Sequence, residues 1–294
     1  MKTLVLANPA AGGRRGRLLP QVLDYLRSLG AKFDVLSTDS PTELEEAARQ
    51  AAVEGVECVI AAGGDGTAHH AIQGLVGSEA ALGLLPLGNG NDLARSLAIP
   101  ADPLLACHVL VRGSTRQIDL ARVRGPVNAY YACVGSVGFD AAVNRMANER
   151  RAFFRGPMLY LASAIRVLLR FEPIRLELSS DGGNFSGEAM LAVVANSASY
   201  GGGLRIAPEA RLDDGRLDVL IVEGMSKFEL LDTLPQLLRG THTRKPAIRS
   251  WRASRVELRT PAGWDFFCDG EYLAQLPLTI EIAPLSVSVV APVE

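Results

Sequence analysis

An apolar run stops abruptly at a set of glycines in Cys58-Val59-Ile60-Ala61-Ala62-Gly63-Gly64-Asp65-Gly66-Thr67. Apolar residues in unbroken succession predict a short strand that is buried on both faces. The glycines end the strand and let backbone N–H groups approach an anion closely, and the helix that follows adds the positive end of its dipole. We therefore interpret Gly63–Thr67 as a phosphate-binding turn. Taken alone, it fits a purely structural turn equally well, because glycine also serves positive φ.

Two further strands end in comparable turns. Leu82–Leu87 is apolar and is followed by Gly88–Asp92, and Thr3–Ala7 is followed by Asn8–Gly13. The carboxyl ends of parallel strands meet at one edge of an α/β sheet, where ligands bind. The three turns together favour a single nucleotide site over three unrelated structural turns.

The acidic residue of the first turn indicates a metal ion. The carboxylate of Asp65 would repel a bare phosphate, so its presence makes sense if a divalent cation bridges the two. The common nucleotide signatures are absent. Gly12–Arg17 lacks the Gly-Lys-Ser/Thr of a P-loop, and Gly88–Leu93 fails the third position of a dinucleotide fingerprint.

Strand and helix patterns alternate over the first 120 residues. Ser40-Pro41-Thr42-Glu43 is a capping box that opens a helix to about Val53, between a predicted strand at Phe33–Val35 and the strand at Cys58–Ala62. This order predicts a doubly wound, Rossmann-like α/β sheet. After about residue 125 the chain turns to short strands, at Tyr130–Val137 and beyond, with helical interruptions at Ala141–Leu169 and Ser226–Leu238. This part predicts an antiparallel β-sandwich or barrel.

Composition bounds the function. The chain has 294 residues, 48% of them hydrophobic and 21% charged, which excludes a disordered or fibrous protein. Its 30 Lys and Arg against 32 Asp and Glu give a net charge of −2, so nothing favours a nucleic-acid partner. The cysteines (Cys58, Cys107, Cys133 and Cys268) lie far apart, as expected of free thiols in the cytoplasm. The longest apolar stretch, Pro157–Ile165, is well short of the ~20 residues that span a bilayer.

The motifs, in their order and spacing, resemble the diacylglycerol-kinase catalytic family in its bacterial lipid-kinase branch. That branch is related to sphingosine kinases and more distantly to NAD kinases. The resemblance covers nearly the whole chain and rests on Asn8-Pro9-x-x-Gly12, Gly63–Thr67, Gly88-x-Gly90-Asn91-Asp92-Leu93-Ala94-Arg95, Gly138–Ala141, Ala195-Asn196, Gly201–Gly203, Ala207-Pro208-x-Ala210, Leu212–Gly215 and Asp269-Gly270-Glu271. Each motif is weak alone, and together they are highly specific.

The resemblance implies an ATP-dependent kinase that transfers the γ-phosphoryl group to a lipid hydroxyl, such as that of diacylglycerol, with Mg²⁺. A Rossmann-like nucleotide domain would span residues 1–124 and be completed by residues 285–294, a β-sandwich domain at 125–284 would hold the lipid, and the site would lie in the cleft between them. ATP would contact Asn8, Pro9, Ala10, Ala11, Gly12, Thr38, Gly63, Gly64, Asp65, Gly66, Thr67 and Asn89. A structural Mg²⁺ would bind Asp214 with the carbonyls of Arg211 and Arg216.

The resemblance also assigns the chemistry. Glu271 falls on the general base, and Asp65, with Asp92 and Asp214, on a network of metal and water that leads to the transferred phosphate. A solvated turn carboxylate is the alternative for Glu271, because Asp-Gly-Glu turns are common. We expect Asp269 to serve the turn or to accept backbone N–H groups.

Two departures from the family pattern stand out. Asn89 occupies a position where the family usually has Thr, although its amide can still donate a hydrogen bond. His69-His70 stand where Asn-Glu is usual. Adjacent residues on a helix point in different directions, so we expect packing or surface roles for the histidines rather than a metal pair.

The segment Arg145–Arg175 combines arginines with Phe153, Phe154 and a series of aliphatic residues. Such a segment suits an anionic membrane surface, where a lipid substrate resides. A core helix with a solvated arginine face is an equal alternative. We expect a cytoplasmic protein with peripheral contact at the membrane.

Two rival functions remain open at this stage. NAD kinases share the Gly-Gly-Asp-Gly-Thr motif, but the later Asn196 and Asp-Gly-Glu elements favour a lipid kinase. A non-catalytic lipid- or nucleotide-binding regulator is disfavoured by the presence of all four acidic residues, Asp65, Asp92, Asp214 and Glu271. The acceptor lipid stays open, because diacylglycerol, a sphingoid base and phosphatidylglycerol all fit an apolar pocket.

Overall fold

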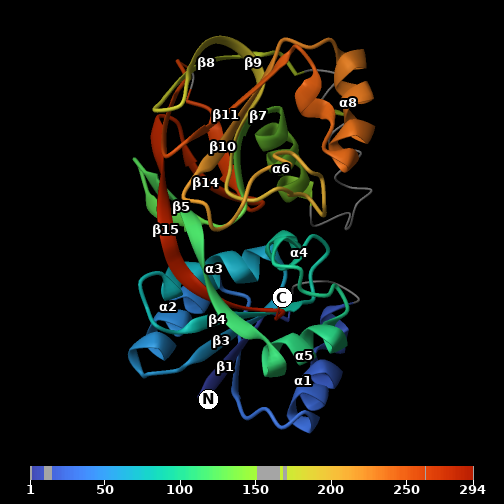
Figure 1. The fold of residues 1–294 in the computed structure, drawn as a ribbon, viewed down its shortest axis with the longest axis vertical. Helices are drawn as coiled ribbons and strands as arrows, with labels where there is room; N and C mark the ends of the chain where they lie inside the picture. Colours follow the sequence, from blue (N-terminus) through green and yellow to red (C-terminus); the bar gives the residue numbers. More distant parts are fainter. Residues whose placement is uncertain (1, 10–14, 151–165, 168–170, 262, 294) are drawn as a thin grey trace. The chain divides into compact units, whose positions relative to one another are not determined.

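The computed structural model describes residues 2–9, 15–150, 166–167, 171–261 and 263–293 (Figure 1). The chain divides into two compact units. Unit 1 comprises Met1–Leu120 and Ala283–Glu294, and unit 2 comprises Ala121–Ile282. The chain leaves unit 1 within strand β5 (Ser114–Arg124) and returns to it within strand β15 (Leu278–Ala291).

Unit 1 is built around a parallel sheet. Its strand order is β2-β1-β3-β4-β15, and each neighbouring pair is parallel. This is the order of flavodoxin-like doubly wound folds, in which the direction of winding reverses between β1 and β3. The elements are β1 (Thr3–Ala7), η1 (Gly16–Leu18), α1 (Leu19–Ser28), β2 (Asp34–Ser37), α2 (Pro41–Val53), β3 (Cys58–Gly63), α3 (Asp65–Leu75), β4 (Ala81–Pro86), α4 (Asp92–Ser96) and α5 (Pro103–Arg112).

The patterns in the sequence account for these elements. Every residue of β3 and β4 is buried, as expected of central parallel strands that helices cover on both faces. Helices α2 and α3 cover one face of the sheet, and α1 and α5 cover the other (Figure 1). Helix α2 begins as predicted, with the Ser40 side chain accepting a hydrogen bond from Glu43 N. The predicted doubly wound sheet is confirmed.

Unit 2 consists mainly of antiparallel strands, which confirms the predicted β-sandwich. Strand β9 pairs with β7, β8 and β10, while β12 lies between β8 and the first half of β15. The elements are β6 (Asn128–Tyr131), β7 (Val134–Gly138), α6 (Phe139–Arg150), β8 (Ile174–Ser180), β9 (Asn184–Ala195), β10 (Leu217–Glu223), α8 (Lys227–Arg239), η2 (His242–Arg244), β11 (Ile248–Ala253), β12 (Arg255–Arg259), β13 (Asp265–Cys268) and β14 (Glu271–Gln275).

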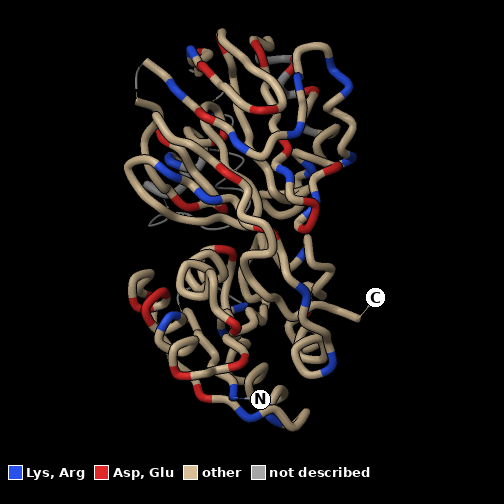
Figure 2. The backbone as a smooth tube through the Cα atoms, turned by 60° about the vertical axis from the view of Figure 1, so that its left-hand side comes forward, with Lys and Arg blue, Asp and Glu red and all other residues tan. Residues whose placement is uncertain are grey.

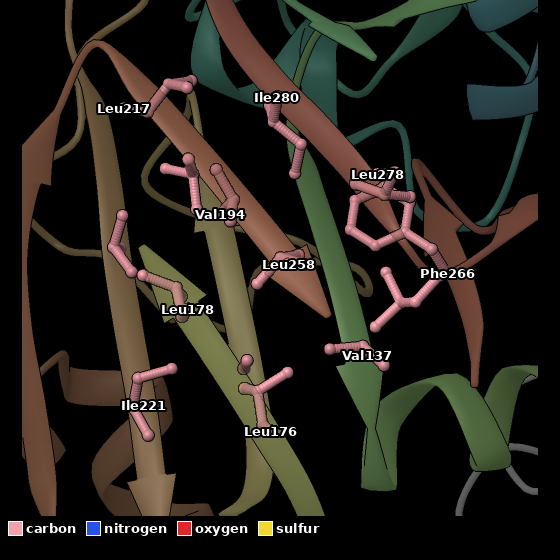
Figure 3. Packing of buried hydrophobic residues seen from close by; sticks show 14 of the residues in the cluster. Val137, Leu176, Leu178, Val194, Leu217, Ile221, Leu258, Phe266, Leu278 and Ile280 are labelled. Carbon is pink, nitrogen blue, oxygen red and sulfur yellow. The ribbon is translucent and has the colours of Figure 1, made fainter. Parts of the chain in front are cut away.

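The core of unit 2 is formed by inward-facing residues of these strands. Figure 3 shows side chains from several strands pointing toward one another, among them Val194 of β9, Leu258 of β12 and Phe266 of β13. Alternation along each strand places these residues on one face, as in β8, where Ile174, Leu176 and Leu178 are buried and the residues between them are exposed.

Some strand boundaries differ from the prediction. The strand expected at Tyr130–Val137 is divided into β6 and β7, because the N–H groups of Ala132 and Cys133 donate to the carboxylate of Asp269 instead of to a neighbouring strand. The last strand continues past Ile282 to Ala291. Of the helix expected at Ala141–Leu169, the first part is α6, and most of the rest lies outside the described residues.

Charge is distributed evenly. Figure 2 shows Lys and Arg interspersed with Asp and Glu along both units, in keeping with the net charge of −2. Among the described residues, no helix is both long enough and apolar enough to cross a bilayer.

Candidate functional site

The reversal of winding between β1 and β3 marks the expected ligand edge of unit 1. Ala7 lies opposite Ala62 at the ends of these strands, and Asn8 N donates to Ala62 O at 3.2 Å. In doubly wound sheets the ligand crevice opens beyond the carboxyl ends of the strands at this point. Asn8 and Pro9 therefore stand beside the Gly63–Thr67 turn. Ala10, Ala11 and Gly12, which were predicted to contact ATP, lie outside the described residues.

Helix α3 starts directly after the glycines and presents its N-terminus at this edge. Gly64 is the N-cap, and the first helical hydrogen bond runs from Ala68 N to Gly64 O at 3.2 Å. The amides before Ala68 belong to the open first turn, where the helix dipole favours an anion. The Thr67 side chain is only 2% exposed, and its Oγ1 has no hydrogen-bond partner among the described residues. A ligand oxygen would supply the partner that this hydroxyl lacks.

The two glycine turns touch through their backbones. A Cβ atom added at Gly88 would lie 2.5 Å from Gly64 Cα, so any side chain there would push the turns apart. Sequence reasoning expected both turns at one edge of the sheet. The structure brings them into direct contact.

The carboxylate of Asp65 clamps the second turn. Its Oδ2 accepts a hydrogen bond from Asn91 N at 2.7 Å, and its Oδ1 accepts one from Asp92 N at 2.6 Å. These bonds hold Asn91 in a left-handed conformation with φ of 53°, from which α4 begins at Asp92. Asn91 reinforces the turn, because its Oδ1 accepts from Gly88 N at 3.0 Å and its Nδ2 donates to Gly88 O at 2.8 Å. Asp65 thus has a structural role that the sequence did not indicate.

The same turn forms a cradle of two carboxylates. A Cβ atom at Gly90 would lie 2.5 Å from Asp65 Oδ2 and 3.4 Å from Asp92 Oδ2, so both oxygens face the space that glycine leaves open. Mg²⁺ is commonly bound by one or two carboxylates together with substrate phosphates and water. The described residues contain no group of three or more acidic, His or Cys side chains suited to a metal, and the two carboxylates fit a cation that shares its shell with phosphate.

Other predicted nucleotide contacts have distinct surroundings. Thr38 N donates to Ala7 O at 3.0 Å, which places this residue beside the end of β1. The Thr38 hydroxyl donates to Glu43 and accepts from Ser40 N, so it already serves the start of α2. Asn89 is exposed at the tip of the second turn.

The adjacent histidines on α3 have packing roles. His69 is 5% exposed, whereas His70 Nδ1 lies 2.9 Å from Glu45 Oε1 on α2.

Two arginines at the glycine turns were not singled out from the sequence. Arg15 Nη1 lies 3.5 Å from Gly88 O, and Arg95 Nη2 lies 3.5 Å from Gly90 O. Guanidinium groups suit phosphate recognition because they present several donors in a planar fork. The position of Arg95 three residues after Asp92, one helical turn away on α4, was the signal that could have identified it.

In unit 2, Glu271 is the first residue of β14 and follows a rigid turn. Asp269 and Gly270 have φ of 50° and 85°, the positive values that a type I′ hairpin turn requires. Asp269 accepts hydrogen bonds from the N–H groups of Ala132, Cys133 and Val134 at 2.9–3.1 Å, so its predicted role as an N–H acceptor is confirmed. The turn is anchored on both sides, which fixes the backbone from which Glu271 projects.

The predicted structural metal ligand, Asp214, lies in the turn before β10. Its Oδ1 accepts from Arg216 N at 3.1 Å, while its Oδ2 is buried and makes no hydrogen bond among the described residues. The nearest described cation is Arg252, whose Nη1 lies 3.5 Å from Asp214 Oδ2. The buried Oδ2 of Asp214 thus faces the positive charge of Arg252. An oxygen in such a position suits the single carboxylate ligand of a cation. Burial also raises the pKa of neighbouring Asp218, against the opposing effect of Arg252.

Of the basic segment at Arg145–Arg175, the structure describes residues 145–150, 166–167 and 171–175. Arg145 Nη1 forms an ion pair with Asp265 Oδ2 at 3.1 Å, and Gln275 Nε2 donates to the other oxygen of Asp265 at 3.0 Å. These residues line a cavity of about 330 Å³ together with Ala141, Ala142, Gly263 and Trp264. The positive charge of Arg145 is therefore matched within unit 2. Residues 151–165 and 168–170, on which the membrane prediction depends, lie outside the described residues.

Asp140 lies in a buried polar cluster. In the sequence it stood out only as part of the Gly138–Ala141 motif. Ser136 Oγ donates to Asp140 Oδ2 at 2.8 Å, and Tyr200 OH donates to Asp140 Oδ1 at 3.2 Å. The Asp140 side chain, which is 3% exposed, thereby links the start of α6 to the glycine-rich loop after Tyr200.

Comparisons with known proteins match both units. The diacylglycerol kinase catalytic domain model matches residues 2–123, and the model described as the YegS C-terminal NAD kinase beta sandwich-like domain matches residues 133–291. A diacylglycerol kinase of Mycobacterium tuberculosis is 31% identical over 99% of this chain and 95% of that protein. A diacylglycerol kinase of Bacillus subtilis is 30% identical over 93% of this chain and 90% of that protein.

Solved structures share the fold. The crystal structure of a diacylglycerol kinase from Bacillus anthracis has a TM-score of 0.73 at 20% identity, over 99% of this chain and 96% of that one. An NAD kinase from Archaeoglobus fulgidus in complex with ATP has a TM-score of 0.54 at 13% identity, over 99% of this chain and 93% of that one. The chain thus shares its fold with solved structures of both kinds of kinase. The chain belongs to the diacylglycerol kinase family, a family of lipid kinases.

Proposed function

We propose that the protein is an ATP-dependent kinase that transfers the γ-phosphoryl group to the hydroxyl of a lipid such as diacylglycerol, with the help of Mg²⁺. The observation that carries this proposal is the N-terminus of α3, which opens beside the carboxylates of Asp65 and Asp92 at the point where the winding of the sheet reverses. An anion-binding helix terminus next to paired carboxylates suits a phosphate with its metal ion.

The glycine turns would hold the phosphates of ATP. Amides of the first turn of α3 donate to phosphate oxygens, and the buried hydroxyl of Thr67 supplies a further donor. Arg15 and Arg95 add positive charge beside the carbonyls of the second turn. Asn8, Pro9, Ala10, Ala11, Gly12, Thr38, Gly63, Gly64, Gly66 and Asn89 complete the proposed nucleotide contacts.

Asp65 and Asp92 would hold the catalytic Mg²⁺. When bound, this ion supplies neutralisation of the charge on the phosphate oxygens. The clamp by Asp65 fixes the second glycine turn, so the carboxylates are aligned before any ligand arrives. Asp214, with the carbonyls of Arg211 and Arg216, would hold a separate structural cation.

Glu271 would act as the general base. Its carboxylate accepts the proton of the lipid hydroxyl as the oxygen–phosphorus bond forms. Asp269 anchors the preceding turn through three backbone N–H groups, which supports a defined backbone position for Glu271. The cavity in this unit offers apolar surface from Ala141, Ala142 and Trp264 beside the Arg145–Asp265 ion pair, and we assign residues 125–284 to lipid binding.

Transfer of label from ATP tests the proposal. The protein is incubated with γ-labelled ATP, Mg²⁺ and a total-lipid extract, and in a parallel reaction with NAD in place of lipid. We expect labelled phospholipid that depends on Mg²⁺, and no labelled NADP. Label in NADP and not in lipid would assign the protein to the NAD kinases, and no label in either acceptor would refute the kinase activity.

A further inference from the structure

Arg252 of β11 reaches three acceptors with one side chain. It lies directly opposite Asp218 in the antiparallel β10–β11 pair, which brings its Nε to 3.5 Å from Asp218 Oδ1. Its Nη1 lies 3.5 Å from Asp214 Oδ2, and its Nη2 donates to the carbonyl of Glu209 at 2.9 Å. The guanidinium is therefore held by the strand register and by the Glu209 carbonyl, in front of the Asp214 carboxylate.

The two carboxylates retain coordination capacity despite this neighbour. Asp214 and Asp218 have side chains 20% and 16% exposed. The Oδ2 atom of each is buried and makes no hydrogen bond among the described residues. The 3.5 Å separations from Arg252 neutralise charge without satisfying the oxygen lone pairs. Two partly buried acids thus share one guanidinium, which leaves an excess of negative charge at the cluster.

We propose that Arg252 is an internal competitor for the divalent cation at Asp214, so that it sets how tightly this site binds the ion. The inference rests on the proposed function, which assigns a structural Mg²⁺ to Asp214. A cation on Asp214 Oδ2 at the usual ~2.1 Å would stand close to Nη1 and repel it. Binding therefore requires Nη1 to leave Asp214.

Arg252 can withdraw without being expelled from the cluster. Because the guanidinium is planar and moves as one body, a shift of Nη1 also displaces Nε and Nη2, whose contacts with Asp218 and the Glu209 carbonyl then re-form around the shifted group. In the metal-free state Asp214 pairs with Arg252, and in the metal-bound state it pairs with the cation. The two states then differ in this contact and not in the course of a loop. The apparent affinity equals the intrinsic affinity multiplied by the fraction of molecules in which Arg252 has released Asp214. This keeps cation binding weak and reversible.

Titration of Mg²⁺ into the nucleotide-free protein by calorimetry tests this directly. Arg252→Gln should bind Mg²⁺ up to about fivefold more tightly than the wild type, the gain expected when a partly exposed ion pair no longer competes. Without Mg²⁺, the same variant should have a lower melting temperature, because two acids lose their counter-ion. The double variant Asp214→Ala with Arg252→Gln should bind Mg²⁺ no more tightly than Asp214→Ala alone.

Arg249→Gln is the matched control. Arg249 lies on the same strand, and its removal makes the same change in net charge, but its partner is Glu223. Its Mg²⁺ affinity should equal that of the wild type. If Arg252→Gln is too unstable to purify, Arg252→Lys should show a smaller gain in the same direction, because a single ammonium cannot reach all three acceptors.

Several outcomes would overturn the inference. They are equal Mg²⁺ affinities in the wild type and Arg252→Gln, an equal gain in Arg249→Gln, or a gain from Arg252→Gln that persists without Asp214. Kinase turnover of the wild type is measured separately. Absent turnover refutes the proposed function, whereas unchanged Mg²⁺ affinity in an active enzyme refutes only the competitor role of Arg252.

Discussion

At the scale of single residues, the hydroxyl of Thr67 distinguishes a ligand site from a structural turn. It is buried and lacks a hydrogen-bond partner among the described residues, so valine would fill the same space without losing a bond in the folded protein. We predict that Thr67→Val leaves the melting temperature unchanged or slightly higher. The KM for ATP should rise by roughly tenfold or more, the effect of losing a hydrogen bond to a charged group.

Thr233→Val is the control for this substitution. Thr233 is equally buried, but its hydroxyl donates to Glu229 O at 2.7 Å and contacts Lys245 Nζ at 2.8 Å. Its loss should lower the melting temperature and leave the KM for ATP unchanged. A destabilised Thr67→Val with an unaltered KM would make Thr67 a structural residue.

Glu271 allows a test of the chemistry. Glu271→Gln keeps the size of the side chain but cannot accept a proton, so we predict a loss in kcat of about 10²- to 10⁴-fold, the usual contribution of a general base. Glu188→Gln, at an exposed position on β9, should retain the wild-type rate. Melting temperatures identify variants that fail to fold. A folded Glu271→Gln with wild-type kcat would leave Glu271 as a turn residue.

At the scale of elements, Asp65 joins α3 to the turn before α4. Asp65→Ala removes both acceptors of the Asn91 and Asp92 amides, so we predict a loss of roughly 2 kcal/mol in the free energy of unfolding, together with loss of activity. Asp24→Ala is the comparison, because Asp24 is exposed on α1 and forms an ion pair with Arg27. Its loss should cost less than about 0.5 kcal/mol. Urea unfolding measures both. Equal stabilities would mean that the clamp contributes nothing to the fold.

A second carboxylate ties two hairpins of unit 2 together. Asp181 follows β8, and its pKa is lowered to about 2 by the hydrogen bond from the Ser254 hydroxyl and by the N–H groups of Arg255 and Ser254. Because the folded-state pKa lies below the ordinary value of 3.8, the stabilisation is present above about pH 4 and is lost as the pH falls toward 2.

This linkage predicts a pH-dependent difference between variants. Asp181→Asn should be less stable than the wild type near neutral pH, and the difference should shrink between about pH 4 and pH 2. Ser254→Ala removes the hydrogen bond from the Ser254 hydroxyl, so the folded-state pKa of Asp181 should rise toward its ordinary value and the pH-dependent stabilisation should become smaller. Urea unfolding across this range provides the measurement. A difference that stays constant with pH would show that the Asp181 carboxylate titrates alike in the folded and unfolded chains.

Strands β5, β13 and β14 were not predicted from the sequence, and they show where local hydrophobic patterns fail to indicate a strand. Strand β5 carries Asp119 among its apolar residues, and this side chain, 1% exposed, interrupts the pattern that predicts a buried strand. Its Oδ1 accepts from Leu285 N at 2.8 Å, a partner 166 residues away. Strands β13 and β14 flank the Asp269-Gly270 turn and are too short to show a clear period. By contrast, β3 and α2 have strong local signals and appear where expected.

At the scale of the whole molecule, the order of motifs predicted the family and the two kinds of unit. The candidate site was predictable as far as the glycine turns, because strand ends and glycines are local features. The clamp of Asp65 on the second turn was not, since it joins residues 26 and 27 positions apart through the backbone of a left-handed turn. Arg252 was equally hidden, because its proximity to Asp214 depends on the register of β10 and β11.

The most direct test of the central claim is the rate at which ATP phosphorylates diacylglycerol in mixed micelles. Label from γ-labelled ATP is followed into the organic-extractable product in the presence of Mg²⁺. The account predicts steady formation of labelled phosphatidic acid by the wild type, abolished by EDTA and by Asp65→Ala. Turnover of another hydroxyl lipid in place of diacylglycerol would change the acceptor and preserve the mechanism. A folded wild-type protein that transfers no phosphate to any lipid would contradict the account.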